Sequence, residues 1–209
     1  MKIICIGRNY VDHAKELNNP VPTKPLVFMK PSSALLINNK PLYYPEFTKS
    51  LHYEAEIVLK MAKNGKHVEK GFAPKYVTEI GIGIDFTARD VQSELKKKGH
   101  PWEIAKGFDG SAAMSPFIPI STVDRNAVEF KLTKNKATVQ TGNTKDLIFS
   151  FEHIICYVSK FFKLNIGDLI YTGTPAGVGE VAIGDVLEGF IMQNGEYNDE
   201  APLLYCEVK

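Results

Sequence analysis

The stretch "LHYEAEIVLK" (residues 51–60) places two carboxylates, Glu54 and Glu56, inside an otherwise apolar segment. Such a segment is typical of a buried β-strand, in which the side chains at positions i and i+2 point to the same face. We therefore expect both carboxylates on one face, with their roots about 7 Å apart. Burying two unpaired negative charges is costly, so the pattern predicts a positive partner between them. The alternative is an exposed edge strand, on which the carboxylates are solvated or paired with lysines.

The length and composition limit the number of domains and the classes of binding partner. The chain has 209 residues, which predicts a single domain over residues 1–209 with a substantial core. Its 44% hydrophobic and 23% charged content is that of an ordinary soluble globular protein. The formal net charge is only +1, which gives no reason to expect nucleic acid or a membrane surface as a partner.

The cysteines and the apolar runs suggest a location. Cys5, Cys156 and Cys206 are odd in number and form no C-x-x-C pair, so we expect free thiols in a reducing compartment. No apolar run approaches the roughly 20 residues that cross a bilayer. The first residues are apolar only up to Arg8, which argues against a signal peptide. The expected location is the cytoplasm.

Periodicity and turn residues predict a β-rich chain with a few helices. Strands are expected at 2–7, 54–60, 79–86, around 168–172, in "DVLEGFIM" and in "PLLYCEV", with a hairpin over 128–142 turning near Asn135. Helices are expected at 10–17, 88–99 and 150–162, the second with a capping-box-like start at Thr87 and a stop at Gly99. Because strands outnumber helices and do not alternate with them, the fold class is α+β rather than doubly wound.

A third carboxylate, Asp85, ends the apolar strand "EIGIGIDF". Three carboxylates without a histidine or cysteine partner nearby indicate a hard divalent cation with oxygen ligands, Mg²⁺ or Mn²⁺. Such a site keeps positions open for water and for substrate oxygens.

Six motifs occur along nearly the whole chain in a fixed order: "GRNYVDHAKEL", "FMKPSSAL", "LHYEAEIVL", "GIDFTARDVQ", "KGHPWEIAKGFDG" and "LIYTGTPAGVG". In order and spacing the set resembles the fumarylacetoacetate hydrolase superfamily, and most of all its short single-domain branch of acylpyruvases and oxaloacetate decarboxylases. The resemblance implies a mixed β-sandwich roll with a few flanking helices, a homodimer, and a Mg²⁺ or Mn²⁺ ion held by Glu54, Glu56 and Asp85.

A metal at this site suggests a chemistry. It can chelate a small 2-keto acid through its carboxylate and keto oxygens and stabilise an enolate at the adjacent carbon. Hydrolysis of an acylpyruvate and loss of CO₂ from oxaloacetate both leave the enolate of pyruvate. Hydrolysis also needs a base, and the candidate is His13 with Glu16, which share one helix face at i,i+3. By spacing alone a solvated surface pair is the alternative, but the resemblance implies a catalytic pair on a mobile lid over about residues 9–20.

The resemblance assigns four further residues. Lys106 would be a cation beside the metal, able to balance negative charge on the substrate or the enolate, where it would otherwise be a solvated lysine. Arg89 and Gln92, one helical turn apart, would bind the substrate's carboxylate and oxygens, although Gln92 could instead be a surface residue. Thr174 would contact the ligand from the glycine-rich loop. Trp102 is expected to be a packing residue.

The sequence thus predicts a metal-dependent enzyme that cleaves the C–C bond of acylpyruvates and decarboxylates oxaloacetate. The alternative is a 2-hydroxydienedioate isomerase or an oxaloacetate tautomerase, which uses the same metal without attack by water. A non-catalytic binding protein would be expected to lack one or more of the three metal ligands, and all three are present.

Overall fold

The fold is seen in a computed structural model that describes residues 1–17 and 19–209. Residue 18, which belongs to the expected lid segment, lies outside the described part. The helices are α1 (Val11–Glu16), α2 (Arg89–Lys98), α3 (Glu103–Lys106) and α4 (Phe151–Phe161). Within the described residues no helix is long and apolar enough to cross a membrane.

Three sheets carry the rest of the fold. The largest contains β2 (Leu26–Lys30), β1 (Ile3–Gly7), β12 (Leu169–Tyr171), β5 (Ala55–Met61), β6 (Val77–Asp85), β8 (Ala112–Met114) and β3 (Leu35–Leu36), with β9 (Ile118–Pro119) on β6. The second contains β11 (Ala137–Asn143), β10 (Glu129–Lys134), β14 (Val186–Ile191) and β15 (Leu204–Glu207). The third contains β13 (Gly179–Glu180), β4 (Leu51–Tyr53) and β7 (Thr87–Ala88).

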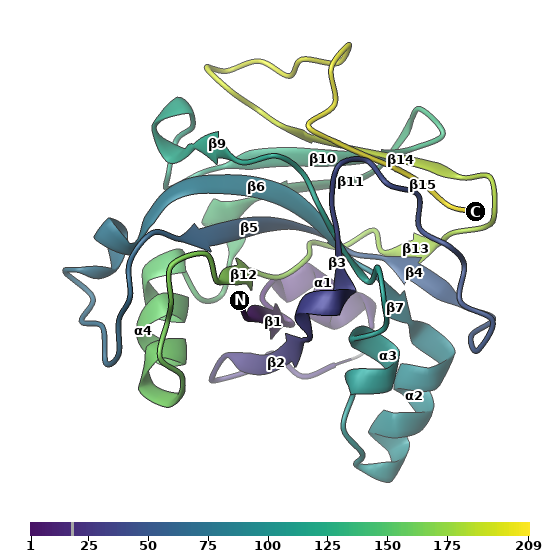
Figure 1. The fold of residues 1–209 in the computed structure, drawn as a ribbon, viewed down its shortest axis with the longest axis horizontal. Coiled ribbons are helices and arrows are strands. Elements are labelled where there is room, and N and C mark those ends of the chain that lie inside the picture. The colour runs from purple at the N-terminus through teal and green to yellow at the C-terminus, as the bar shows by residue number, and fades with distance from the viewer. Residues whose placement is uncertain (18) are drawn as a thin grey trace.

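The large sheet is mixed and strongly curled. β1 is parallel to β12 and antiparallel to β2, whereas β5 and β6 form a long antiparallel pair. The four-stranded sheet lies over one face of β5 and β6, and β1, β2, α1 and α4 lie on the other side (Figure 1). The larger core cluster fills the space between the sheets and under α4; it includes Ile57, Ile82, Phe130 and Ile154. The expected β-rich α+β sandwich roll is thereby confirmed.

Most expected elements appear with ends shifted by a residue or two, and two details differ. The segment 51–60 is not one strand: Glu54 lies between β4 and β5, where the chain passes from the small sheet into the large one. The capping box at Thr87 is wrong, because Ala88 is the residue before α2 and the Thr87 hydroxyl donates to the carbonyl of Asp85. Gly99 does end the helix, in the left-handed conformation with φ 66°.

Candidate active site

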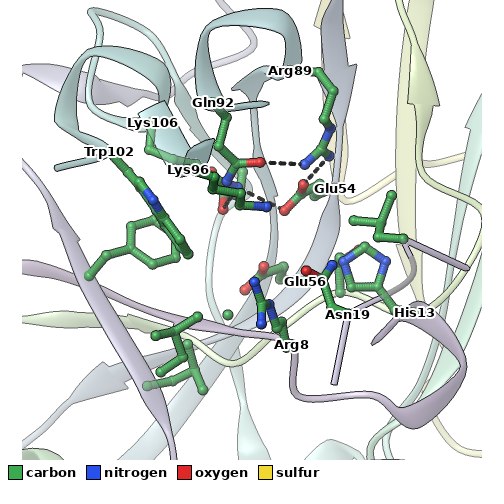
Figure 2. Close-up of a pocket in the computed structure, with 17 residues that line it drawn as sticks. Arg8, His13, Asn19, Glu54, Glu56, Arg89, Gln92, Lys96, Trp102 and Lys106 are labelled. Atoms are coloured by element: carbon green, nitrogen blue, oxygen red, sulfur yellow. Dashed lines mark hydrogen bonds and ion pairs between the residues drawn. The ribbon is translucent and has the colours of Figure 1, made fainter. Parts of the chain in front are cut away.

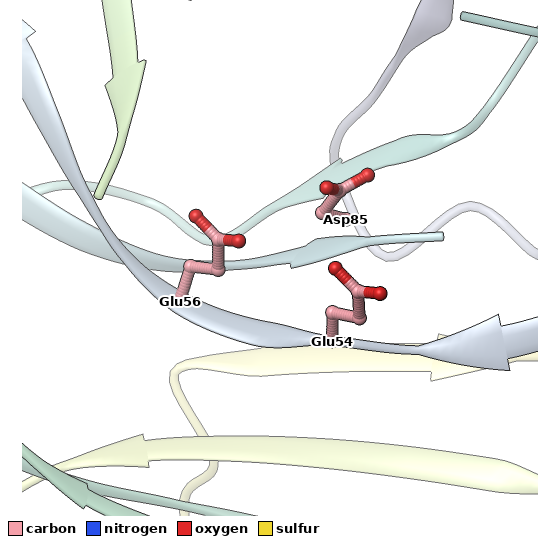
Figure 3. Close-up of side chains that lie close together, drawn as sticks. All are labelled: Glu54, Glu56 and Asp85. Carbon is pink, nitrogen blue, oxygen red and sulfur yellow. The ribbon is translucent and has the colours of Figure 1, made fainter. Parts of the chain in front are cut away.

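The register of β5 on β6 brings the three carboxylates together. Ala55 pairs with Ile84, and the Asp85 amide donates to the Glu54 carbonyl at 2.9 Å, so Asp85 stands opposite Glu54. Glu56 pairs with Gly83, where a side chain would collide with Tyr171, Val58 and the Ala113 carbonyl. One ligand oxygen from each carboxylate lies within 4.8 Å of the other two, and all three residues are buried (Figure 3).

Two cations hold Glu54. Lys106, from α3, places Nζ 2.9 Å from Glu54 Oε2 and 2.6 Å from Asp85 Oδ2, and Arg89, from α2, pairs with Glu54 Oε1. Burial alone would raise the pKa of Glu54, but the charges of Lys106 and then Arg89 outweigh it and hold that pKa well below its usual range. Burial likewise opposes the charge on Lys106, and Asp85 and Glu54 outweigh it, so the pKa of Lys106 is raised. Glu54 and Lys106 are therefore both charged at neutral pH.

A third buried cation, Lys30, supports Asp85 from the far side. Its Nζ lies 2.7 Å from Asp85 Oδ1 and also donates to the Ser111 carbonyl and hydroxyl at 3.0 and 3.1 Å. It donates to the Lys106 carbonyl as well, so one ammonium group ties the end of β2 to Asp85 and to the backbone of α3. This contact positions Lys106 and Asp85 relative to each other.

Glu56 has no such cation among the described residues. Its Oε2 accepts a hydrogen bond of 2.7 Å from the Gly173 amide, and no described residue donates to Oε1. Burial, and then the negative charge of Asp85, raise the pKa of Glu56 well above its usual range. A buried carboxylate beside two others, with an oxygen left without a donor, fits a divalent cation: the donor set is all oxygen, as Mg²⁺ and Mn²⁺ prefer.

The loop after β12 is shaped to reach Glu56. Gly173 has φ 108°, and a Cβ on it would lie 2.6 Å from Cβ of Asn9. The Asn9 side chain is fully buried and bonds the Thr172 carbonyl at 2.8 Å and both backbone groups of Phe149. Only glycine fits this position, and the close approach aims its amide at the carboxylate.

Gln140, on β11, joins the same loop to the start of β5. Its Oε1 accepts from the Ala55 amide at 2.9 Å, and its Nε2 donates to Thr174 Oγ1 at 2.9 Å and to the Pro175 carbonyl at 3.0 Å. Ala55 separates Glu54 from Glu56, so this buried amide fixes the backbone between the two carboxylates.

The short helix α1 carries the histidine and glutamate. His13 is 4% exposed, and its Nδ1 lies 3.2 Å from Glu16 Oε2. Because a carboxylate only accepts, Nδ1 donates to it, and in the neutral ring the lone pair is then on Nε2. The second oxygen of Glu16 accepts from the Gly177 amide at 3.0 Å, so the same carboxylate links α1 to the glycine-rich loop.

A small pocket, with about 30 Å³ of free space, opens in front of the carboxylates. A space of this size holds about two waters, so it suits only a small ligand. Residues from β1, α1, β5, α2 and α3 line it together (Figure 2). The lining residues with polar side chains are Arg8, His13, Asn19, Glu54, Glu56, Asp85, Arg89, Gln92, Lys96, Trp102, Lys106 and Thr174.

A family model described as "Fumarylacetoacetate (FAA) hydrolase C-terminal" matches residues 2–200. The chain belongs to the fumarylacetoacetate hydrolase family. This match confirms the resemblance seen in the motifs, and the chain is an enzyme of that family.

Relatives of this hydrolase family cover most of the chain. The mitochondrial oxaloacetate tautomerase FAHD1 of Mus musculus is 42% identical over 190 residues, 90% of this chain and 86% of the relative. The mitochondrial oxaloacetate decarboxylase of Dictyostelium discoideum is 40% identical over 189 residues, 90% of this chain and 87% of the relative. Among solved structures, fumarylpyruvate hydrolase from Pseudomonas aeruginosa in complex with Mn²⁺ and pyruvate aligns with a TM-score of 0.90 and 34% identity, covering all of this chain and 89% of the other.

The structure brings nearly all the site residues expected of a fumarylacetoacetate hydrolase to one place. His13, Lys106, Arg89, Gln92 and Thr174 all line the pocket with the three carboxylates. Arg89 Nη1 donates to Gln92 Oε1 at 2.8 Å, and Gln92 is buried, which excludes the surface position considered for it. Glu16 does not line the pocket but stands behind His13. Their roles in binding and catalysis remain proposals.

The sequence reasoning missed several residues of the site. Trp102 is not only a packing residue: it lines the pocket, and Lys96 Nζ lies 5.2 Å from its ring centroid. Lys30 and Gln140 were missed because their contacts cross between distant strands. Lys96 could have been predicted from its spacing. It lies seven residues after Arg89 and four after Gln92, which places all three on one helix face.

Proposed function

We propose that this protein is a divalent-metal-dependent enzyme acting on small 2-keto acids, which hydrolyses the C–C bond of acylpyruvates and decarboxylates oxaloacetate. The observation that carries the proposal is the convergence of three buried carboxylates on one point at the base of a small, cation-lined pocket. Glu54, Glu56 and Asp85 would hold Mg²⁺ or Mn²⁺. An ion bound there supplies Lewis-acid stabilisation of negative charge developing on the keto oxygen.

The chain's own residues supply the remaining functions. Lys106 stands against Glu54 and Asp85 and, being charged, can offset negative charge on a substrate next to them. His13 offers the lone pair of Nε2 as a base for water, with the ring oriented by Glu16. Arg89 and Gln92 form one hydrogen-bonded pair at the wall and would bind substrate oxygens, and Thr174 would do so from the loop.

The α1 segment is proposed to act as a lid over this pocket. Few contacts join α1 to the rest of the site. One of them is the hydrogen bond from the Gly177 amide to Glu16. A short helix held in this way opens at low cost. Hydrogen exchange of residues 9–17 with and without oxalate, which mimics the enolate of pyruvate, tests this: oxalate should increase protection, and equal protection would contradict a lid.

A panel of substrates tests the function. Acetylpyruvate, oxaloacetate and a hydroxydienedioate are each assayed after chelation and again with Mg²⁺ or Mn²⁺ restored. We expect turnover of acetylpyruvate and oxaloacetate only with metal. Glu180→Gln, at an exposed carboxylate outside the pocket, is the matched control for Glu56→Gln and should keep full activity. Equal turnover without metal, or none of any substrate with it, would contradict the proposal.

A second candidate is tautomerisation of oxaloacetate, favoured by the relatives' name and by the presence of His13 in the same pocket. It needs proton transfer at the carbon beside the keto group but no C–C cleavage. Following the enol by its ultraviolet absorbance, and CO₂ release in the same sample, separates the two. Enol conversion much faster than CO₂ release would identify tautomerisation as the main activity.

Two expectations from the sequence stay predictions. The relatives from mouse and Dictyostelium are named as mitochondrial proteins, so the cytoplasmic location needs cell fractionation. The homodimer needs a mass measurement by light scattering, with a monomer as the contradicting result.

A further inference from the structure

Two cations in the pocket have no carboxylate partner. Arg89 and Lys106 are both paired with Glu54, but neither Arg8 nor Lys96 forms an ion pair with any residue from 1–17 or 19–209. Both are half-buried and line the pocket. Cations that are partly removed from water usually have a partner, so this pair points to a ligand.

Lys96 faces the pocket because of its helix position. Arg89, Gln92 and Lys96 lie on one face of α2, and the Lys96 ammonium stands over the Trp102 ring. The next residue in the same lysine run, Lys97, is exposed. The lysine run at residues 96–98 is therefore not all solvated surface, because Lys96 points into the pocket.

Arg8 reaches the pocket from the opposite wall. It follows β1 with φ 56°, a left-handed conformation that is unusual for arginine, and the bonds of the next residue, Asn9, hold the backbone there. Arg8 and Lys96 point into the same space from different elements (Figure 2).

The two side chains also repel each other. Burial, and then the charges of Arg89 and Arg8, lower the pKa of Lys96 to about 8. Burial lowers the pKa of Arg8. An anion between them would offset this repulsion. Neither cation forms an ion pair with Glu54, Glu56 or Asp85, although the charge of Glu54 opposes part of the shift at Lys96.

We propose that Lys96 and Arg8 form a second anion subsite that binds the distal carboxylate of a 2-keto dicarboxylic acid. The inference rests on the proposed function, in which the 2-keto acid end lies at Glu54, Glu56 and Asp85. The pocket then selects diacids over keto acids with an uncharged end, and Lys96 and Arg8 determine that specificity.

The test uses two keto acids that differ only at the far end: 2-oxoglutarate, with a carboxylate, and 2-oxopentanoate, with a methyl group. Binding of each to the Mn²⁺-loaded protein is measured by calorimetry at pH 7. We expect the wild type to bind the diacid at least about tenfold more tightly, because a hydrogen bond between charged groups contributes that much. Lys96→Gln and Arg8→Gln should each bring the ratio close to one, mainly by weakening the diacid.

Lys97→Gln is the matched control and should leave the ratio unchanged. Lys96→Glu should reverse the preference, and this variant keeps the test decisive if the change at Arg8 unfolds the protein. Equal binding of both acids by the wild type, or an equal loss of both in Lys96→Gln, overturns the subsite and leaves the proposed function standing. If neither these acids nor oxalate bind in the presence of Mn²⁺, the proposed function and the subsite both fail.

Discussion

Replacing Glu56 by glutamine should separate stability from metal binding. Glu56 is the carboxylate whose pKa is raised by burial and by Asp85, and it is the one of the three without a cation partner among the described residues. Glutamine has the same shape, and its carbonyl oxygen can still accept from the Gly173 amide. The substitution therefore replaces a carboxyl whose ionised form is disfavoured by its surroundings with a neutral amide, and the hydrogen bond from Gly173 is kept.

The magnitude follows from linkage. A ligand at one hundred times its Kd stabilises the native state by about 2.7 kcal/mol. For a chain of this length, 1 kcal/mol corresponds to roughly 2–4 °C in Tm, so wild type should gain about 5–11 °C on adding Mg²⁺ or Mn²⁺. If loss of a ligand weakens metal binding about a hundredfold, the same ion concentration gives only about 0.4 kcal/mol, or about 1–2 °C.

Thermal unfolding followed by circular dichroism, after chelation and with each ion, measures both quantities. Without metal, the Tm of Glu56→Gln should equal or exceed that of wild type. With metal, the increase in Tm that wild type shows should nearly vanish in this variant. Glu180→Gln should behave as wild type in both conditions. A full metal shift in Glu56→Gln, or a metal-free Tm several degrees below wild type, would refute the reasoning that Glu56 is an unneutralised metal ligand.

Three further changes test other parts of the structure. His13→Ala should slow acetylpyruvate hydrolysis at least about a hundredfold and affect oxaloacetate decarboxylation much less, because only hydrolysis needs a base for water; an equal loss in steady-state assays of both would make the histidine part of a shared step. Lys106→Met should slow both reactions alike, since it removes the charge beside Glu54 and Asp85, and selective loss of one would contradict this role. Asp168→Asn, outside the pocket, should lower the free energy of unfolding by about 1–3 kcal/mol at pH 7, because the buried carboxylate bonds the side chain and amide of Lys2. Burial alone would raise the pKa of Asp168, but the bonds from Lys2 outweigh burial and lower it. The stabilisation by this carboxylate is therefore complete above about pH 4 and is lost on acidification. Urea titrations at several pH values should show the difference in unfolding free energy between variant and wild type shrinking at low pH, and a constant difference would contradict this.

Local patterns predicted the secondary structure well, because they depend on neighbours in the sequence. The hairpin near Asn135 forms as expected, with both turn residues, Asn135 and Lys136, at positive φ. The expected apolar face of α4 is buried, and Ser150 caps the helix by accepting from the His153 amide. At Thr87 the same reasoning failed, since its hydroxyl donates to the Asp85 carbonyl two residues earlier and α2 begins after Ala88 without a side-chain cap.

The site was predictable where its residues lie close together in the sequence. The spacing of Glu54 and Glu56 and that of His13 and Glu16 were readable directly from the chain. What the sequence could not supply was the register of β5 on β6, which puts Asp85 opposite Glu54. Contacts such as that of Lys30 with Asp85 also depend on long-range packing, and a lone lysine after an apolar run carries no mark of it.

The charges of the pocket bear on which reaction the site favours. Among the residues that the structure describes, four cationic side chains and three carboxylates line it, so this lining is already positive before any divalent ion is counted. Such a site binds anions, and the proposed subsite at Lys96 and Arg8 would hold the distal carboxylate in its charged form. Decarboxylation removes that charge as CO₂ leaves, so cations on this carboxylate stabilise the bound substrate more than the transition state. Tautomerisation, and hydrolysis of a longer diacid, keep the carboxylate charged throughout and lose nothing from the contact. The arrangement that selects a dicarboxylic acid therefore also favours the reactions that leave its far end intact.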